Sequence, residues 1–200
     1  MNINEYNKVK DFSYRNYCSY LQIKYGEGLS DYMTKSWNKN SKCRRTKEGL
    51  LVHHIYEDHA IKLSDKECAM KYPFEWQKAE NLAYCDYLEH LYLHILICED
   101  SPLEFDRLDY LGIGGIVDYI VPELNDFYSG WQTAQEWRRN CHNLIRNDKN
   151  VYLLLLKRFK NIFRKYSCFN SECLLTSLNE EFGYWSKRQN AALFEEILNL

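Results

Sequence analysis

The sequence has little of what marks disordered, membrane-spanning or secreted chains. It holds only 8 glycines and 3 prolines in 200 residues, while 46% of the residues are hydrophobic and 27% are charged. That balance predicts a folded globular chain. The longest mainly apolar runs, near Leu91–Cys98 and Val151–Leu156, are too short to span a bilayer. The polar opening MNINEYNKVKDFSY does not resemble a signal peptide, so we expect a cytoplasmic protein that contacts no membrane.

Two short motifs are also missing. None of the eight cysteines belongs to a C-x-x-C pair, which favours free thiols in a reducing compartment, most of them buried as small apolar side chains. The cluster Gly112-Ile113-Gly114-Gly115 lacks the G-x-G-x-x-G spacing and the Lys-Ser/Thr of a P-loop. We therefore expect a turn there and not a phosphate-binding loop.

Charge is segregated along the chain, although the net charge is only −2. Residues 31–49 contain six Lys or Arg and two acids, residues 99–136 contain nine acids and one Arg, and residues 137–166 contain nine Lys or Arg and one Asp. Such patches could contact phosphates. Alternatively, the acidic and basic segments of the C-terminal half pair with each other.

Local signals predict a mixed first half and a helical second half. Expected elements of the first half are a helix over 13–25, a strand over 50–52 that runs into His53-His54, a short helix opened by a capping box at 64–67, a strand over 82–84, and a helix from Asp86 to about Cys98. Expected helices of the second half are 124–144, 151–166 and 178–198. The acidic stretch ICEDSPLEFD separates them, so we predict domains at 1–100 and 101–200.

Histidines are concentrated around the predicted strands and helix. His90 and His94 are spaced i, i+4, which places both rings on one helix face about 6 Å apart and suits two ligands of one metal ion. His53 on the first strand could supply a third ligand. His54 would point to the other side of the extended backbone, where it could act on water as a general base. An isolated pair at this spacing is otherwise a surface or packing feature.

Together these residues form a recognisable pattern. The segment LVHHI followed by N-L-x-x-C-x-x-x-E-H-x-x-x-H, over about Leu50–Ile97, resembles the HNH or ββα-metal nucleases, in particular colicin-type DNases and phage homing endonucleases. The resemblance implies a short hairpin packed on one helix with a single divalent ion between them. The expected fold class is therefore α+β, mainly α with a small ββα-metal (HNH) motif.

The resemblance also assigns roles to individual residues. It implies that His53, His90 and His94 bind the metal and that His54 is the general base. Asn81 matches the motif's Asn, which holds the loop between the strands by side-chain hydrogen bonds or, in some members, touches the metal.

Three basic residues precede the first strand: Arg44, Arg45 and Lys47. They could bind phosphates next to the scissile bond, or they could belong to a solvated loop.

The sequence departs from the family between the two strands. A 26-residue insert, Ile55–Glu80, replaces the usual Gly-rich turn, and no Pro follows the paired histidines. Glu57, Asp58 and His59 lie in this insert; any of them could approach the metal, but a solvated turn is the preferred interpretation. Cys85, at an apolar position before the helix, is expected to be core.

The predicted function is a metal-dependent endonuclease that hydrolyses DNA phosphodiesters with one metal ion and His54 as base. Mg²⁺ is the expected ion in catalysis, with Zn²⁺, Mn²⁺ or Ni²⁺ as alternatives. Two other functions stay open: an inactive, metal-stabilised module that binds nucleic acid or protein, and a nuclease directed at RNA. The C-terminal helices could be core with a basic face, select DNA, or form a homodimer.

Overall fold

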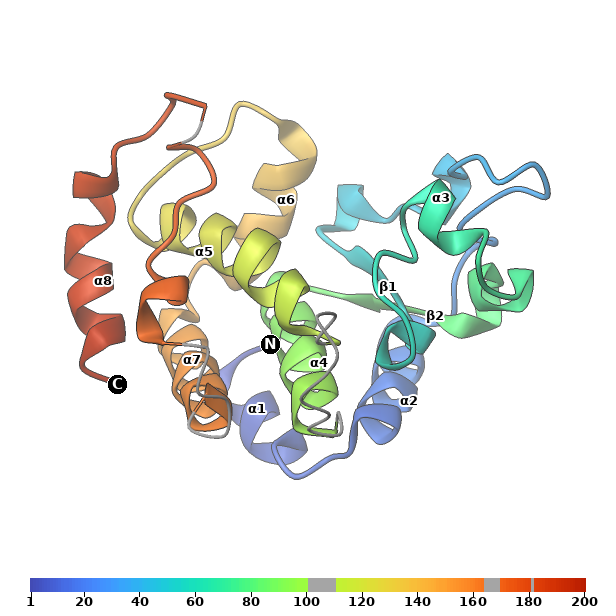
Figure 1. Cartoon of the computed structure of the whole chain (residues 1–200), viewed down its shortest axis with the longest axis horizontal. Helices are drawn as coiled ribbons and strands as arrows, with labels where there is room; N and C mark the ends of the chain where they lie inside the picture. The colour runs from blue at the N-terminus through green and yellow to red at the C-terminus, as the bar shows by residue number, and fades with distance from the viewer. Residues whose placement is uncertain (101–110, 164–169, 181) are drawn as a thin grey trace.

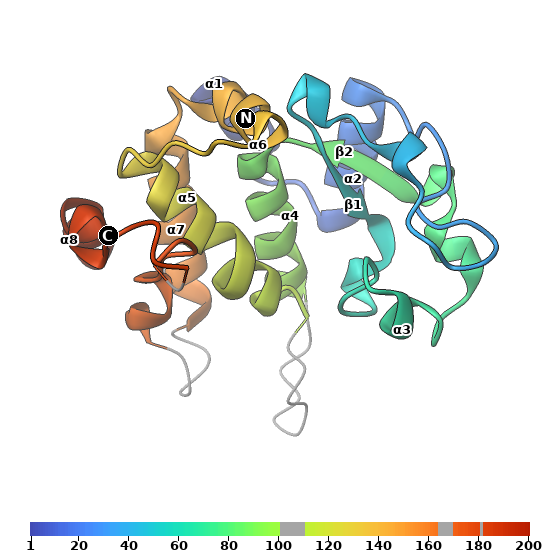
Figure 2. The ribbon, with the colours of Figure 1, turned by 90° about the horizontal axis from the view of Figure 1, so that it is seen from above.

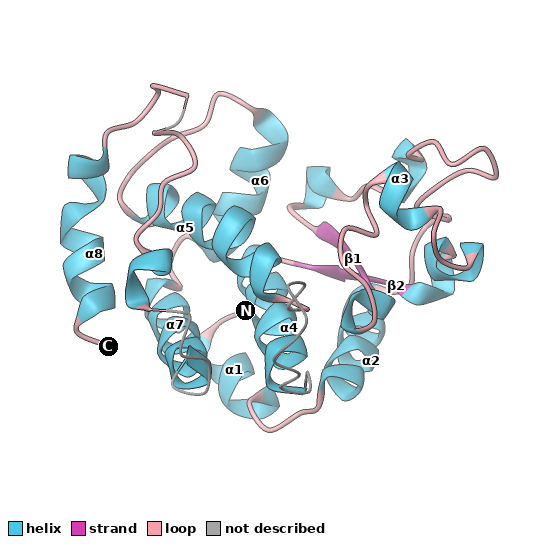
Figure 3. Cartoon of the chain, viewed as in Figure 1, coloured by secondary structure: helices cyan, strands magenta, loops and turns pink. Residues whose placement is uncertain are grey.

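The protein consists mainly of helices, with a small two-stranded sheet at one side of the molecule (Figure 1). The computed structural model describes residues 1–100, 111–163, 170–180 and 182–200. Most of these residues are helical, and the two strands form the only sheet among them (Figure 3). The expected α+β class, mainly α, is confirmed.

The elements follow one another along the chain with short connections. The α-helices are α1 Ile3–Val9, α2 Tyr14–Tyr25, α3 Lys66–Ala69, α4 Tyr87–Asp100, α5 Val121–Tyr128, α6 Glu136–Ile145, α7 Lys149–Phe163 and α8 Ala191–Leu198. The strands are β1 Leu51–His54 and β2 Leu82–Cys85. Short 3₁₀ helices are η1 Ser41–Cys43, η2 Thr46–Glu48, η3 Ile55–Asp58, η4 Phe74–Gln77, η5 Ala79–Asn81, η7 Ser171–Leu174 and η8 Lys187–Asn190, and η6 Gly115–Ile120 is a π-helix.

The strands pair antiparallel and fix the direction of the two adjacent histidines. Opposite His53 lies Ala83, and opposite His54 lies Leu82. Because successive side chains of a strand point to opposite faces, His53 and His54 must face different surroundings. Helix α2 packs on β2 on one side of this hairpin.

Asp86 caps helix α4, as the sequence predicts, and Glu89 completes the cap. The Asp86 carboxylate accepts a hydrogen bond from the Glu89 N–H at 2.8 Å, and Glu89 accepts one from the Asp86 N–H at 2.7 Å. This reciprocal pair satisfies two N–H groups that a helix start leaves free. Lys24 of α2 donates to Glu89 at 2.6 Å, which ties α2 to the first turn of α4.

The hydrophobic core extends across the predicted domain division. Helix α4 lies between the hairpin with α2 on one side and α5 and α7 on the other (Figures 1 and 2), and it packs against α2, α6 and α7. It is buried on every side from Tyr87 to Cys98 except at His90. One cluster of buried apolar side chains reaches from α1 to α8. The predicted boundary itself falls largely in residues 101–110, outside the described residues.

Several predicted elements differ in extent. The strand predicted over 50–52 is found as Leu51–His54, and Asp65 instead of Ser64 caps α3, accepting from the N–H groups of Glu67 and Cys68. In the glycine cluster only Gly112, at φ +84°, lies in a turn, while Gly115 begins the π-helix.

The helix predicted over 124–144 is wrong, because it is interrupted between Tyr128 and Glu136. Gly130 adopts φ +105°, its N–H donates to Phe127, and the Trp131 N–H donates back to the Asp126 carbonyl. These are the bonds of a left-handed helix terminus, which glycine adopts at least cost.

The helix predicted over 178–198 begins only at Lys187, where Ser186 and Gln189 form a capping box. Of the helix predicted over 151–166, the last three residues lie outside the described residues.

Acidic and basic segments do pair in the C-terminal half. Arg158 of α7 makes a two-pronged contact with Glu99 of α4, both arms at 2.7 Å, and Arg138 of α6 lies 3.1 Å from Glu123 of α5. Part of the segregated charge is therefore used inside the fold. No helix within the described ranges combines the length and the apolar character needed to cross a membrane.

Candidate metal centre

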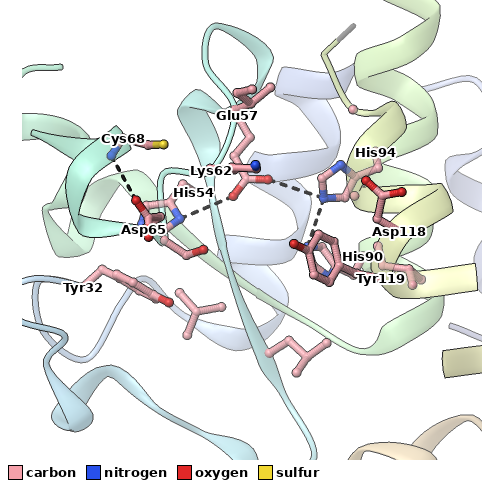
Figure 4. Close-up of a pocket in the computed structure, with 18 of the residues that line it drawn as sticks. Tyr32, His54, Glu57, Lys62, Asp65, Cys68, His90, His94, Asp118 and Tyr119 are labelled. Carbon is pink, nitrogen blue, oxygen red and sulfur yellow. Dashed lines mark hydrogen bonds and ion pairs between the residues drawn. The ribbon is translucent and has the colours of Figure 1, made fainter. Parts of the chain in front are cut away.

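Three histidines and one glutamate converge in the space between β1, η3 and α4. His53, Glu57, His90 and His94 each bring one ligand atom into a group whose members all lie within 4.8 Å of one another. Glu57 Oε2 lies 3.6 Å from His53 Nδ1 and 3.4 Å from His94 Nε2, and His94 Nε2 lies 3.2 Å from His90 Nε2. Figure 4 shows the carboxylate of Glu57 turned toward His94, with His90 beside it. Imidazole and carboxylate groups in such proximity can hold one cation.

Local structure accounts for the position of each ligand. His90 and His94 lie one turn apart on α4, as the i, i+4 spacing predicts. His53 enters from β1, and the 3₁₀ helix η3 then turns the chain so that Glu57, four residues later, comes back over the same site. Gly115 of η6 backs the His94 ring so closely that a Cβ there would lie 2.4 Å from Cε1. The expected solvated turn is therefore wrong for Glu57.

His53 has a ring nitrogen that no group of the described protein satisfies. Its Nε2 lies 2.8 Å from the Tyr14 hydroxyl, and this hydroxyl donates its hydrogen to the Ile55 carbonyl at 2.9 Å. With its hydrogen donated in this way, the hydroxyl accepts from His53 Nε2–H, and this assignment places the lone pair on Nδ1. Nδ1 is buried without a hydrogen-bond partner and faces the Glu57 carboxylate. Two acceptors that face each other in a buried place are satisfied when a cation lies between them.

Burial keeps the histidines neutral. It lowers the pKa of His53 to about 3, and it also lowers the pKa values of His90 and His94. Burial alone would raise the pKa of Glu57, but the positive charge that His53 and His94 gain when acid protonates them, together with a hydrogen bond from His54, outweighs burial and lowers that pKa. Neutral imidazoles and an ionised carboxylate are the forms in which these side chains bind metals.

The lowered pKa values predict that the metal-free protein is sensitive to acid. An unfolded histidine takes up a proton below about pH 6.5, whereas folded His53 stays neutral down to about pH 3, so stability falls as the pH drops between these values. The loss is at most about 1.4 kcal/mol per pH unit from this fully buried ring. Glu57 adds a loss below about pH 4.5, because the unfolded carboxylate is protonated first.

Thermal unfolding in EDTA between pH 7.5 and 5 measures this effect. We expect the melting temperature to fall with pH, and to fall less steeply in the His53→Gln variant. A melting temperature independent of pH over this range would contradict a buried, neutral His53.

His54 lies on the opposite face of β1 from His53 and has a different partner. Its Nε2 lies 3.2 Å from Gln77 Oε1, while Gln77 Nε2 donates to the Leu63 carbonyl at 3.2 Å. The second bond fixes the orientation of the amide, so Gln77 accepts from His54 Nε2–H and leaves the lone pair on Nδ1. That nitrogen lies 3.5 Å from Glu57 Oε1. His54 is thus held with one basic nitrogen directed toward the metal-ligand cluster.

Asn81 does not line the cleft. Its Nδ2 donates to the Glu75 carbonyl at 2.8 Å, which ties η4 to η5 just before β2. The contact holds the end of the insert. Gln77 belongs to the same region and was not indicated by the sequence, since no motif marks a lone Gln in a 26-residue insert.

A cleft of about 1420 Å³ opens in front of the cluster. His54, Glu57, His90 and His94 lie on its floor, and it is larger than the ~300–1,000 Å³ of ordinary small-molecule pockets. Such a volume suits a polymeric substrate.

The three basic residues singled out in the sequence have different surroundings. Arg44 is exposed and lines the cleft, whereas Lys47 is exposed and lies outside its lining. Arg45 pairs with Glu48, donates to the Tyr25 carbonyl and lies over the Tyr84 ring at 4.8 Å. The guanidinium of Arg45 is therefore used within the fold.

Comparison with known proteins gives no assignment: no protein-family model matches the chain, and no curated protein or solved structure matches it. The geometry of the site and the sequence motif are therefore what indicates a function.

Proposed function

We propose that the protein is a metal-dependent nuclease of the HNH type, which hydrolyses phosphodiester bonds of DNA. The observation that supports this proposal most strongly is that His53, His90 and His94 converge on one point. His54 occupies the next position of β1 and lines the cleft in front of this cluster. The contact of Asn81 with the Glu75 carbonyl supports the loop-holding role that the motif assigns to it. Hairpin, helix and ligands occur in the order that the motif requires.

The protein's own residues can carry the acid–base part of the reaction. Gln77 holds His54 with a free lone pair on Nδ1, which can take a proton from a water molecule as that water attacks phosphorus. Arg44 on the cleft wall can bind a phosphate next to the scissile bond. His53, His90 and His94 would hold a divalent ion, which would supply positive charge to stabilise the transition state and the departing 3′ oxygen.

The donor set fits a metal and indicates its class. His53 Nδ1 is a buried lone pair without a partner, and Glu57 provides a carboxylate oxygen 3.6 Å away. Three imidazoles favour Zn²⁺ or Ni²⁺ over Mg²⁺ and Mn²⁺, which prefer oxygen ligands. The expectation of Mg²⁺ in catalysis stays a prediction.

Cleavage of supercoiled plasmid tests the proposal. Purified protein in EDTA is compared with protein given Mg²⁺, Mn²⁺, Ni²⁺ or Zn²⁺ singly, and matched DNA and RNA strands are digested in parallel. We expect nicked or linear plasmid only when a metal is present. Failure to cut DNA or RNA with any of the four ions would reject the nuclease, and preferential cutting of RNA would change its substrate.

One observation favours the second candidate, a metal-stabilised binding module without activity. Glu57 brings a fourth ligand to the three histidines, and four protein ligands are typical of structural zinc sites, whereas catalytic sites keep a position open. His54 and the cleft in front of it favour the nuclease, because a structural site has no use for a base there. A homodimer through the C-terminal helices stays a prediction.

A further inference from the structure

We propose that the cleft takes a single-stranded nucleic acid, with the sugar–phosphate backbone along one wall and the bases stacked on aromatic side chains of the other. This inference deepens the proposed function and rests on it, because the bound strand is a substrate only if the protein is a nuclease. The inference is based on two different walls of the cleft. One wall is basic and is formed by Lys39, Arg44 and Lys62, and the opposite wall presents the aromatic side chains of Tyr119 and Trp137.

The first wall presents cations that are free to meet phosphates. Lys39, Arg44 and Lys62 are exposed, all three line the cleft, and none of them forms an ion pair within the described part of the chain. Lys62 has a left-handed backbone, φ 56°, which is unfavourable for a residue with a Cβ. Strain of this kind is retained most often where it positions a functional side chain. Two acids lie beside them: Glu57, which belongs to the metal-ligand cluster, and Asp65, which caps α3 with its carboxylate.

The opposite wall has a different chemistry. Tyr119 is 62% exposed and Trp137 40%, although both line the cleft. In this wall the only charged lining residue of the described chain is Asp118, an exposed acid that repels phosphates. Figure 4 shows Asp118 and Tyr119 close to the two α4 histidines. Phosphates are therefore directed to the first wall and flat apolar groups to the second.

The aromatic wall is attached to the metal centre. Tyr119 and Asp118 belong to the π-helix η6, whose first residue, Gly115, packs against the His94 ring. π-Helical turns occur often at functional sites. A strand stacked on Tyr119 would thus be held at a fixed distance from the ligands on α4.

This asymmetry favours a single strand over a duplex. In a duplex the bases are stacked on each other and phosphates lie along both strands, so Tyr119 and Trp137 find no free base face and Asp118 meets phosphate. A single strand exposes bases on one side and a backbone on the other, and proteins bind it by aromatic stacking beside a cationic groove. Single-stranded DNA and RNA share this chemistry, and the test separates them.

Binding is measured by fluorescence anisotropy in EDTA, so that no metal-dependent cleavage interferes. The probes are end-labelled dT12, rU12 and a 12-base-pair DNA duplex. We expect dT12 or rU12 to bind more tightly than the duplex. Tyr119→Ala and Trp137→Ala should each weaken single-strand binding about 5- to 100-fold, the usual effect of removing one stacking platform. Tyr119→Phe, which keeps the ring, should bind like the wild type.

Matched controls use residues outside the cleft. Tyr184 is 76% exposed and Lys187 is exposed, and neither lines the cleft. Tyr184→Ala should leave single-strand binding unchanged. Lys62→Ala should reduce the slope of log affinity against log salt by about 0.7, the share of one phosphate contact on a single strand. Lys187→Ala should not change this slope.

The two proposals fail in different ways. Equal or tighter binding of the duplex, or full single-strand binding by both alanine variants, would overturn the single-strand inference even if metal-dependent cleavage is found. Tight single-strand binding without cleavage by any metal would instead keep the inference and remove the nuclease. Circular dichroism of the variants checks that these exposed substitutions leave the fold intact.

Discussion

Replacing His54 by alanine is expected to lower plasmid cleavage at least about 100-fold while leaving bound metal unchanged, since a positioned general base contributes about 10²–10⁴. His54 lies on the other face of β1 from His53 and is not one of the four residues of the ligand cluster. Loss of its ring removes the Nδ1 lone pair that faces the cleft. Initial rates of nicking and the metal content of the purified protein together measure both parts of the prediction.

Two further variants separate a base from a merely structural histidine. His59→Ala removes an exposed ring on the same segment and should cut like the wild type. Gln77→Leu removes the acceptor of His54 Nε2–H, so we expect a lower rate and a changed pH profile with normal metal content. Unchanged cleavage in His54→Ala would remove this residue from the mechanism.

The parts of the site that the sequence predicts are those with a local signal. Ser13 and Asp86 precede helices as caps, and the spacing of His90 and His94 places them on one face of α4 whatever surrounds it. The alternation along a strand likewise separates His53 from His54. Each of these features depends on a few consecutive residues.

The parts that the sequence does not predict depend on contacts between distant segments. Glu57 reaches the cluster because η3 reverses the chain immediately after β1, and an acid in a polar insert otherwise resembles a solvated residue. Gln77 becomes important only through Leu63 and His54, which lie 14 and 23 residues away along the chain. Residue 115 must be glycine because a Cβ at this position would clash with the His94 ring, and no local sequence pattern indicates this contact.

A similar limit applies to the helices of the second half. The apolar spacing over 124–144 continues through the break after Tyr128, because α5 and α6 are both amphipathic and pack on the same core. Only Gly130 marks the interruption, and an isolated glycine is tolerated within many helices. Periodicity therefore predicts that these residues are helical but not where the chain turns.

Replacing Glu57 by glutamine is the second change with a large expected effect, since it tests whether the carboxylate is a ligand. The amide keeps the size of the side chain but loses the charge that lies 3.6 Å from His53 Nδ1 and 3.4 Å from His94 Nε2. We expect metal binding to weaken at least about 10-fold, by analogy with the 10–100-fold losses caused even by changes behind a metal ligand. A 10-fold loss removes about 1.4 kcal/mol of the stability that saturating metal gives.

Calorimetry with and without Zn²⁺ or Mn²⁺ measures this loss. The metal should raise the melting temperature of Glu57→Gln by about 3–6 °C less than that of the wild type, for a chain of this size. Asp58→Asn is the matched control, because Asp58 is in the same turn but pairs with Arg15 outside the cluster. An unchanged metal response in Glu57→Gln would show that the carboxylate is not a ligand. Plasmid cleavage then separates the two candidate functions. A nuclease that holds its ion by three histidines should still cut in the Glu57→Gln variant at saturating metal. A structural four-ligand site gives no cleavage with Glu or with Gln at position 57.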